Sequence, residues 1–205
     1  PGDSGLITVR GRQLLAEADV VVADRLGPRA LLAELDPAVP VIEVGKAPGN
    51  HLATQDEINA VLVREARAGR LVVRLKGGDP YVLGRGGEEL AFCQAAGVSV
   101  DVVPGITSAV SVPAAAGIPV THRGVATGFT LVTGHEELSE VPTRADHTLV
   151  LLMGVRRLAD TARRLTERGL DGATPVAIIE RGWMPDQRVT VGTVETIAAQ
   201  AAAVG

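Results

Sequence analysis

The stretch that decides the fold runs Leu71-Val72-Val73-Arg74-Leu75 and, after one lysine, Gly77-Gly78-Asp79-Pro80-Tyr81-Val82-Leu83-Gly84-Arg85-Gly86-Gly87. The first part is a short β-branched run, typical of a buried strand. The second part holds five glycines within eleven residues. Because glycine has no Cβ, the main chain at Gly77 and Gly78 can come close to a bound molecule, and Asp79 adds a carboxylate. Ligands of open α/β sheets bind beyond the carboxyl ends of the strands, so we expect a ligand at this junction.

Short apolar runs alternate with helical patterns through the first half of the chain, which indicates βα units and a mainly parallel sheet. We expect strands at residues 20–23, 41–44, 71–75 and 100–103. Between the second and third of these, Thr54 and Glu57 have the spacing of a capping box, which predicts the start of a helix. Gly69 is expected to end that helix in the left-handed conformation.

The second half changes rhythm. A helix rich in small residues is expected at 107–116, a second helix at 155–168 ending at Gly169, and strands at 129–133, 148–152, 176–179 and 188–191. Strands outnumber long helices here, which favours a mixed sheet with some antiparallel pairing. We therefore expect two α/β domains, residues 1–120 and 121–205, with a first strand absent before Pro1 and last strands absent after Gly205.

Composition excludes several classes of protein. The 205 residues are 46% hydrophobic but only 2% aromatic, which suits a core of Val, Leu, Ile and Ala. A net charge of −4 gives no electrostatic field that would favour nucleic acid or an anionic membrane, and no apolar run is long enough to span a bilayer. The single cysteine, Cys93, excludes a disulfide and is expected to be a buried thiol. We expect a soluble, cytoplasmic protein without a metal site.

Polar residues and glycines directly follow several expected strands, and in a parallel sheet these positions converge at one edge. Asp24 follows the first strand and is either a site residue or the N-cap of the next helix. Lys46 follows the second strand, where a partly desolvated lysine has a pKa closer to the range of proton transfer, and the alternative is a solvated loop lysine. The glycines could also serve turn geometry alone. Neither a nucleophile elbow nor a P-loop is present, which argues against hydrolases and NTPases.

Several motifs, in order, resemble the tetrapyrrole methylases, and within them the members that C-methylate uroporphyrinogen III. The resemblance covers nearly the whole chain. Its motifs are Pro1-Gly2-Asp3, Ala23-Asp24-Arg25-Leu26, Val44-Gly45-Lys46, Leu75-Lys76-Gly77-Gly78-Asp79-Pro80, Gly84-Arg85-Gly86-Gly87-Glu88-Glu89, Val103-Pro104-Gly105-Ile106-Thr107-Ser108, Gly117-Ile118-Pro119-Val120-Thr121-His122-Arg123 and Val132-Thr133-Gly134-His135.

This resemblance implies a two-domain α/β tetrapyrrole methylase fold, a homodimer, and S-adenosyl-L-methionine in a cleft between the domains as methyl donor, with S-adenosyl-L-homocysteine as product. It further implies that Asp24 is the proton acceptor and Lys46 the proton donor. The residues that it assigns to donor binding are Pro1, Gly77, Gly78, Asp79, Val82, Thr107, Ser108, Met153 and Gly182.

The activity that the resemblance implies is two successive methyl transfers that convert uroporphyrinogen III to precorrin-2, on the route to sirohaem and cobalamin. The acetate and propionate arms of that substrate need cations, and Arg25, Lys46, Arg85, Arg123 and Arg188 lie near expected strand ends. Two alternatives stay open: a methyltransferase for a later precorrin or corrin, and a truncated donor-binding module without activity. A dinucleotide enzyme ranks lower, because Gly-x-Gly-x-x-Gly does not follow an early strand.

Overall fold

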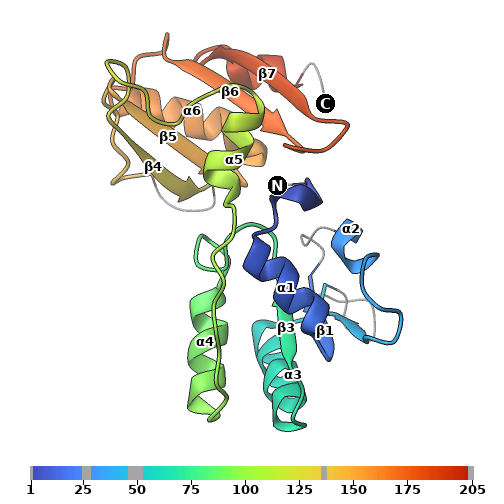
Figure 1. Cartoon of the computed structure of the whole chain (residues 1–205). Helices are drawn as coiled ribbons and strands as arrows, with labels where there is room; N and C mark the ends of the chain where they lie inside the picture. Colours follow the sequence, from blue (N-terminus) through green and yellow to red (C-terminus); the bar gives the residue numbers. More distant parts are fainter. Residues whose placement is uncertain (1, 25–28, 46–52, 135–137, 203–205) are drawn as a thin grey trace. The chain divides into compact units, whose positions relative to one another are not determined.

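The computed structural model describes residues 2–24, 29–45, 53–134 and 138–202. The chain divides into two compact units, one formed by residues 3–107 and the other by residues 108–205 together with Gly2. Each unit has its own sheet or sheets and its own helices (Figure 1). The expected α/β class, with a parallel sheet in the first half and mixed pairing in the second, is confirmed.

Unit 1 is built on a parallel sheet of three strands in the order β2-β1-β3. The strands are β1 (Val20–Ala23), β2 (Val41–Glu43) and β3 (Val72–Leu75), and the helices are η1 (Ser4–Leu6), α1 (Val9–Glu17), α2 (Arg29–Leu32), α3 (Gln55–Arg67) and α4 (Gly86–Ala95). Three of the expected strands thus lie within one residue of their predicted positions. Val22 pairs with Arg74 in the β1–β3 register, which places the ends of these strands side by side.

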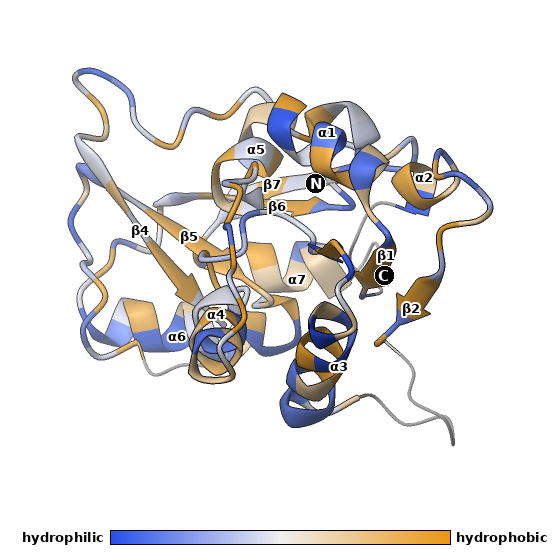
Figure 2. Ribbon diagram, turned by 60° about the horizontal axis from the view of Figure 1, so that its bottom comes forward, coloured by the Kyte–Doolittle hydropathy of each residue, from blue (hydrophilic) through white to orange (hydrophobic). Residues whose placement is uncertain are grey.

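Alternate residues of β1 pack into two different cores, as expected for a central strand covered on both faces. Val21 and Ala23 belong to a cluster with Leu15 of α1, whereas Val22 belongs to a cluster with Leu62 of α3 and with Cys93. Figure 2 shows β1 and β2 as hydrophobic and α3 with residues of both kinds. Burial of both faces explains why β1 is an unbroken apolar run.

Helix α3 begins and ends where the sequence predicts. The Thr54 hydroxyl accepts a hydrogen bond from the Glu57 amide at 3.2 Å, and the Glu57 carboxylate accepts one from the Thr54 amide at 2.7 Å. This reciprocal pair satisfies two amides that the first turn leaves without helical partners. Gly69 follows the helix with φ of 79°, a conformation that glycine adopts without steric cost.

The strand expected at residues 100–103 is not formed, and this prediction was wrong. Its Val-rich pattern is that of a strand, but in the described part of the chain no β-ladder includes these residues. A strand requires a neighbour within about 4.8 Å, and local sequence pattern cannot supply one. Residues 98–106 instead follow α4 without regular secondary structure.

Unit 2 contains two small sheets. Strands β4 (Gly128–Thr133) and β5 (His147–Leu152) pair in parallel, and β6 (Pro175–Glu180) and β7 (Arg188–Thr193) pair antiparallel. All four strands were expected. The helices are α5 (Ser108–Ala115), η2 (Val155–Arg157), α6 (Leu158–Glu167) and α7 (Ile197–Ala202). The helix expected at 155–168 is therefore η2 followed by α6, and Gly169 follows with φ of 93°.

The boundary between the units lies between Thr107 and Ser108, whereas the sequence analysis placed a boundary near Val120. Helix α5 is grouped with unit 2 for a physical reason. The Trp183 indole N–H donates to the Ser111 carbonyl at 2.6 Å, and the Gln187 amide donates to the carbonyl of Ala115 at 3.2 Å. These bonds join α5 to the loop between β6 and β7.

Candidate functional site

The tip of β3 is a place where main chain packs directly against main chain. Gly78 has φ of 74°, and a Cβ built on Gly105 would lie 2.1 Å from the Gly78 carbonyl oxygen. Only glycine at position 105 permits this approach. The Asp79 carboxylate then fastens the two segments, because Oδ2 accepts from the Gly105 amide at 2.9 Å and Oδ1 from the Tyr81 amide at 2.8 Å. The predicted Gly77–Asp79 junction is therefore a rigid turn with a fixed carboxylate.

The loop that follows, residues 80–86, stores backbone strain. Leu83 and Arg85 have φ of 53° and 58°, although neither is glycine. Left-handed conformations of such residues cost about 1–3 kcal/mol each and concentrate at functional sites. The two ends of the loop are in contact, because the Gly86 amide donates to the Pro80 carbonyl at 2.9 Å. A Cβ on Gly86 would lie 2.5 Å from the same oxygen, so glycine is required there. The strained positions thus lie in the loop that contains Val82.

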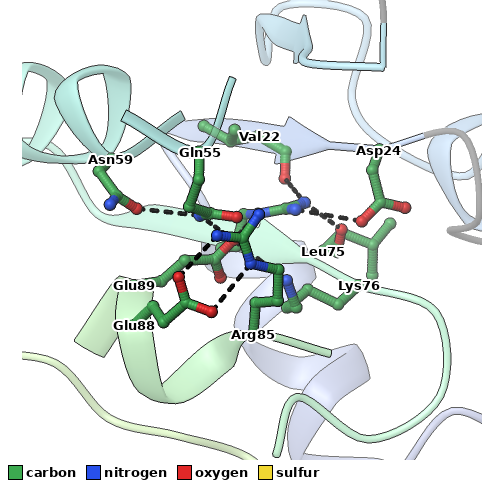
Figure 3. Close-up of polar contacts among 10 residues, drawn as sticks. Val22, Asp24, Gln55, Asn59, Leu75, Lys76, Arg85, Glu88 and Glu89 are labelled. Carbon is green, nitrogen blue, oxygen red and sulfur yellow. Dashed lines mark hydrogen bonds and ion pairs between the residues drawn. The ribbon is translucent and has the colours of Figure 1, made fainter. Parts of the chain in front are cut away.

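Beneath this tip lies a cluster of charged side chains at the ends of β1 and β3 (Figure 3). Arg74 occupies its centre. Its guanidinium contacts Asp24 Oδ2 at 3.1 Å and Glu89 Oε1 at 3.2 Å, and it also donates to the Leu75 carbonyl at 2.9 Å. Lys76 Nζ lies 3.1 Å from Glu89 Oε1. The side chains of Arg74, Lys76 and Glu89 are only 13%, 9% and 7% exposed, so these pairs are largely shielded from water.

This charged cluster includes Asp24, for which both interpretations stay open. The Asp24 carboxylate lies at the carboxyl end of β1 and contacts Arg74 of the neighbouring strand β3 at 3.1 Å. Sequence reasoning missed Arg74 and Glu89. The available signal was the arginine inside an otherwise apolar buried strand, because a buried charge is expected to have a partner.

Unit 1 also contains a cavity of about 520 Å³, here called the slot. Gly78 and Gly105 are among its lining residues, so the glycine tip of β3 borders open space. Its lining includes all of β3 and all of residues 98–106. Helix α4 contributes Glu89, Leu90 and Cys93 to the lining. Burial raises the pKa of the Cys93 thiol, with the nearby Glu89 carboxylate as a smaller cause.

In unit 2 the carboxyl ends of β4 and β5 also meet through glycine. A Cβ on Gly134 would lie 2.3 Å from the Cα atom of Gly154, so these two turns are in main-chain contact. The Gly134 amide donates to the Leu152 carbonyl at 2.7 Å. Met153 stands between Leu152 and Gly154 in the sequence; it has φ of 60° and is 59% exposed. Met153, which the resemblance assigns to donor binding, is thus a strained and exposed residue directly after β5.

The loop of residues 181–187 in unit 2 combines backbone strain with close packing onto α5. Arg181 and Trp183 have φ of 51° and 67°, on either side of Gly182. A Cβ on Gly182 would lie 2.7 Å from a methyl carbon of Val112 on α5, so the main chain of the loop packs onto that helix. The indole bond from Trp183 to Ser111 holds it there. Sequence reasoning selected Gly182 but missed Trp183, whose partner lies 72 residues away.

The predicted site residues thus fall into two groups. Unit 1 carries Asp24, Gly77, Gly78, Asp79, Val82 and Thr107, and unit 2 carries Ser108, Met153 and Gly182. Pro1 and Lys46 lie outside the described residues, as does His135. In the described parts of the chain no group of His, Cys, Asp or Glu is arranged to hold a metal ion.

Two of the cations suggested for substrate arms already have carboxylate partners. Arg85 lies 2.7 Å from Glu88, and this contact raises the pKa of Arg85 and lowers that of Glu88. Arg188 lies 2.9 Å from Glu180 in the β6–β7 register, with the same directions of pKa change. Among the residues that the structure describes, no helix is both long and apolar enough to cross a bilayer.

Comparison with known proteins gives consistent results. A family model described as Tetrapyrrole (Corrin/Porphyrin) Methylases matches residues 1–198. The S-adenosyl-L-methionine-dependent uroporphyrinogen III methyltransferase of Methanosarcina barkeri is 49% identical over 98% of this chain and 82% of its own length. A crystal structure of uroporphyrin-III C-methyl transferase from Thermus thermophilus complexed with S-adenyl homocysteine is 43% identical, with a TM-score of 0.81 over 97% of this chain and 87% of that one. The structure of a cobalt precorrin-4 methyltransferase gives a TM-score of 0.84 at 29% identity, over 100% of this chain and 87% of its own.

Proposed function

The chain belongs to the tetrapyrrole (corrin/porphyrin) methylases, and from this membership we propose that it is an S-adenosyl-L-methionine-dependent C-methyltransferase of uroporphyrinogen III. Two successive transfers would give precorrin-2. The observation that carries this proposal is 49% identity, over nearly the whole chain, to a relative named for that reaction. The described geometry supports it, because glycine tips and strained loops follow the strands from which the predicted donor residues project.

The residues at these tips fit the methyl donor, which carries a positively charged sulfur, an amino acid part and an adenosine part. Open space borders the side-chain-free main chain at Gly78 and Gly105. The Asp79 carboxylate is held in place by two amides, which pre-organises this turn. We propose that Gly77, Gly78, Asp79, Val82 and Thr107 bind the donor from unit 1. Pro1, Ser108, Met153 and Gly182 complete the set in this proposal.

The bound donor supplies an electrophilic methyl group. A pyrrole carbon of the substrate provides the electron pair for the new C–C bond, the C–S bond breaks, and a proton must then leave the macrocycle. The chain contributes alignment, which can supply a large part of the reduction of the barrier. Asp24 is the proposed proton acceptor, since Arg74 fixes its carboxylate at the end of β1. Lys46 is the proposed proton donor.

Substrate binding would use cations that face the acetate and propionate arms. Arg85 is a good candidate, because it lies on the strained loop after β3 and its partner Glu88 is on the surface, where an ion pair is weak. The arms of the substrate could therefore replace Glu88 at little cost. We further propose that the enzyme acts in the cytoplasm as a homodimer, and light scattering in solution tests the dimer directly.

The second candidate function is methylation of a later precorrin or corrin. It is favoured by the TM-score of 0.84 to the cobalt precorrin-4 methyltransferase, but the 29% identity to that protein is much lower. Incubation of the protein with methyl-labelled donor and either uroporphyrinogen III or a corrin precursor separates the two candidate functions. Label in uroporphyrinogen III supports the main proposal, label only in a corrin precursor supports the second, and donor binding without any transfer indicates a non-catalytic module.

A further inference from the structure

The loop of residues 181–187, between β6 and β7, connects several of the residues proposed to bind the methyl donor. It contains Gly182, which is buried. The Gly182 carbonyl accepts a hydrogen bond from the Gly2 amide at 3.0 Å, and Gly2 directly follows Pro1 in the sequence. The loop also packs on α5, the helix that begins at Ser108. A displacement of this loop would therefore disturb the main chain at more than one proposed donor residue.

Gln187, the last residue of the loop, uses both ends of its carboxamide. Oε1 accepts a hydrogen bond from the Trp183 amide at 2.8 Å, and Nε2 donates one to the Ala115 carbonyl at 3.2 Å. Because Trp183 directly follows Gly182, the first bond closes the loop on itself, and the second attaches it to the last residue of α5. One side chain thus links the main chain beside Gly182 to that helix.

The two partners require an amide side chain at position 187. The Trp183 N–H needs an acceptor and the Ala115 C=O needs a donor, and a carboxamide carries one of each at the same end of the side chain. The partners also fix the orientation of the carboxamide, because the reverse orientation would set N–H against N–H and C=O against C=O. Ionised glutamate lacks the donor, and lysine lacks the acceptor. Glutamine is therefore selected here by chemistry as well as by length.

The Ala115 carbonyl is an acceptor that α5 cannot satisfy by itself. Ala115 is the last residue of the helix, and the last four carbonyls of an α-helix have no helical donor. The carbonyl before it, that of Ala114, accepts from the Gly117 amide at 3.0 Å in the turn that follows the helix. Gln187 supplies the donor for Ala115. Its side chain thus caps α5 and holds the loop in the same contact.

The attachment holds the loop in a conformation that its residues do not favour by themselves. Arg181 and Trp183 have φ of 51° and 67°. Left-handed residues of this kind persist only where surrounding contacts impose the conformation. The Arg181–Asp186 ion pair within the loop is 50% and 59% exposed, so it adds little. Together with the indole bond of Trp183, the Gln187 carboxamide therefore opposes relaxation of the strained loop.

We propose that Gln187 is a positioning residue for the methyl donor, which holds Gly182 in the conformation that binds the donor without touching the donor itself. The inference rests on the proposed function, since that function assigns Gly182 to donor binding. Without the carboxamide, the loop relaxes and only a fraction of the molecules has it in the competent conformation. The apparent affinity for the donor then decreases by that fraction. The chemical step on a donor that is already bound changes little.

Calorimetric titration of the full chain with S-adenosyl-L-homocysteine tests this proposal and needs no tetrapyrrole. Gln187→Met keeps the length of the side chain but removes both the donor and the acceptor. We expect its Kd to be about fivefold higher than that of the parent or more, because one neutral hydrogen bond of typical net strength corresponds to about fivefold in an equilibrium constant. Gln187→Glu keeps only the acceptor when ionised, and its Kd should increase as well. The matched control is Gln200→Met, which replaces an exposed glutamine of α7 in the same unit and should leave Kd unchanged.

A second control separates positioning from general stability. Leu165→Ala opens a cavity in the core cluster of Leu138, Val141 and Leu165 in unit 2, so it should lower Tm and leave Kd unchanged. Unchanged Kd in both Gln187 variants would overturn the proposal even if their Tm decreases, because Gln187 would then only stabilise the unit. An equal increase of Kd in Leu165→Ala would overturn it too.

Methyl-transfer kinetics give an independent readout of the same variants. KM for the donor should increase with little change in kcat, and a decrease in kcat at unchanged KM would overturn the proposal. If Gln187→Met does not fold, the Kd of Gln187→Glu decides. A parent chain that does not bind S-adenosyl-L-homocysteine would contradict the proposed function itself, whereas binding by the parent with equal Kd in the variants contradicts only the role of Gln187.

Discussion

Replacement of Arg74 by methionine is predicted to destabilise unit 1 strongly. Methionine retains an unbranched apolar stem but removes the guanidinium that joins Asp24 and Glu89. Loss of one partner from a buried ion pair costs about 3–5 kcal/mol. Lys76 stays 3.1 Å from Glu89 and still offsets its charge, so we expect the lower end, about 3 kcal/mol. For a protein of this size that corresponds to a decrease in Tm of about 6–12 °C, measured by scanning calorimetry.

Arg163→Met is the matched control for this prediction. Arg163 also contacts two carboxylates, Asp160 at 2.5 Å and Glu167 at 2.6 Å, and these distances are shorter than those of Arg74. Its side chain is 59% exposed, however, and water screens such pairs. We expect a Tm within error of the parent. Equal Tm decreases for the two variants would refute the argument that shielding, and not the number or length of contacts, determines the stabilisation by Arg74.

Three further predictions follow from the site. Asp79→Ala should weaken binding of S-adenosyl-L-methionine at least tenfold in calorimetry because two fixed amides lose their acceptor, and unchanged affinity would count against the site. Trp183→Phe removes one indole hydrogen bond, worth about 1 kcal/mol, that holds the loop of Gly182 on α5. KM for the methyl donor should therefore increase about fivefold with little change in kcat. A decrease in kcat alone would contradict a positioning role for Trp183. Arg188 lowers the pKa of Glu180 in the folded state, so the pair stabilises the fold at pH values above the unfolded pKa of Glu180 and loses this effect as the pH decreases through the folded pKa. Glu180→Gln should therefore make the acid unfolding transition less steep. An identical acid transition in the variant and the parent would exclude the effect.

Local patterns were sufficient for most of the fold. The two ends of α3 could be predicted from the capping box at Thr54 and from Gly69, because helix caps depend on residues that are neighbours in sequence. The apolar run at residues 20–23 likewise indicated a strand, because the pattern lies within neighbouring residues. Residues 100–103 carry an equally good strand pattern and yet form no strand. Strand formation depends on a partner strand elsewhere in the chain, and within the described residues no strand pairs with this segment.

The candidate site could be predicted only in part. Asp24 directly follows β1, and Gly77, Gly78 and Asp79 lie within four residues of the end of β3, so position along the chain was enough to select them. Arg74 and Trp183 required three-dimensional information. Arg74 reaches Asp24 because the β1–β3 register sets it beside Val22, and Trp183 reaches α5 through a bond across 72 residues. Neither register nor long-range packing can be read from the local sequence.

Methyl transfer to uroporphyrinogen III is the measurement that tests the central claim most directly. The full chain is mixed with S-adenosyl-L-methionine labelled in its methyl group and with uroporphyrinogen III, and the tetrapyrrole products are separated and analysed by mass. We predict label first on a singly and then on a doubly methylated product, together with S-adenosyl-L-homocysteine. Label transfer to a corrin precursor but not to uroporphyrinogen III would contradict the assignment of substrate, and donor binding without any transfer would contradict the assignment as an enzyme.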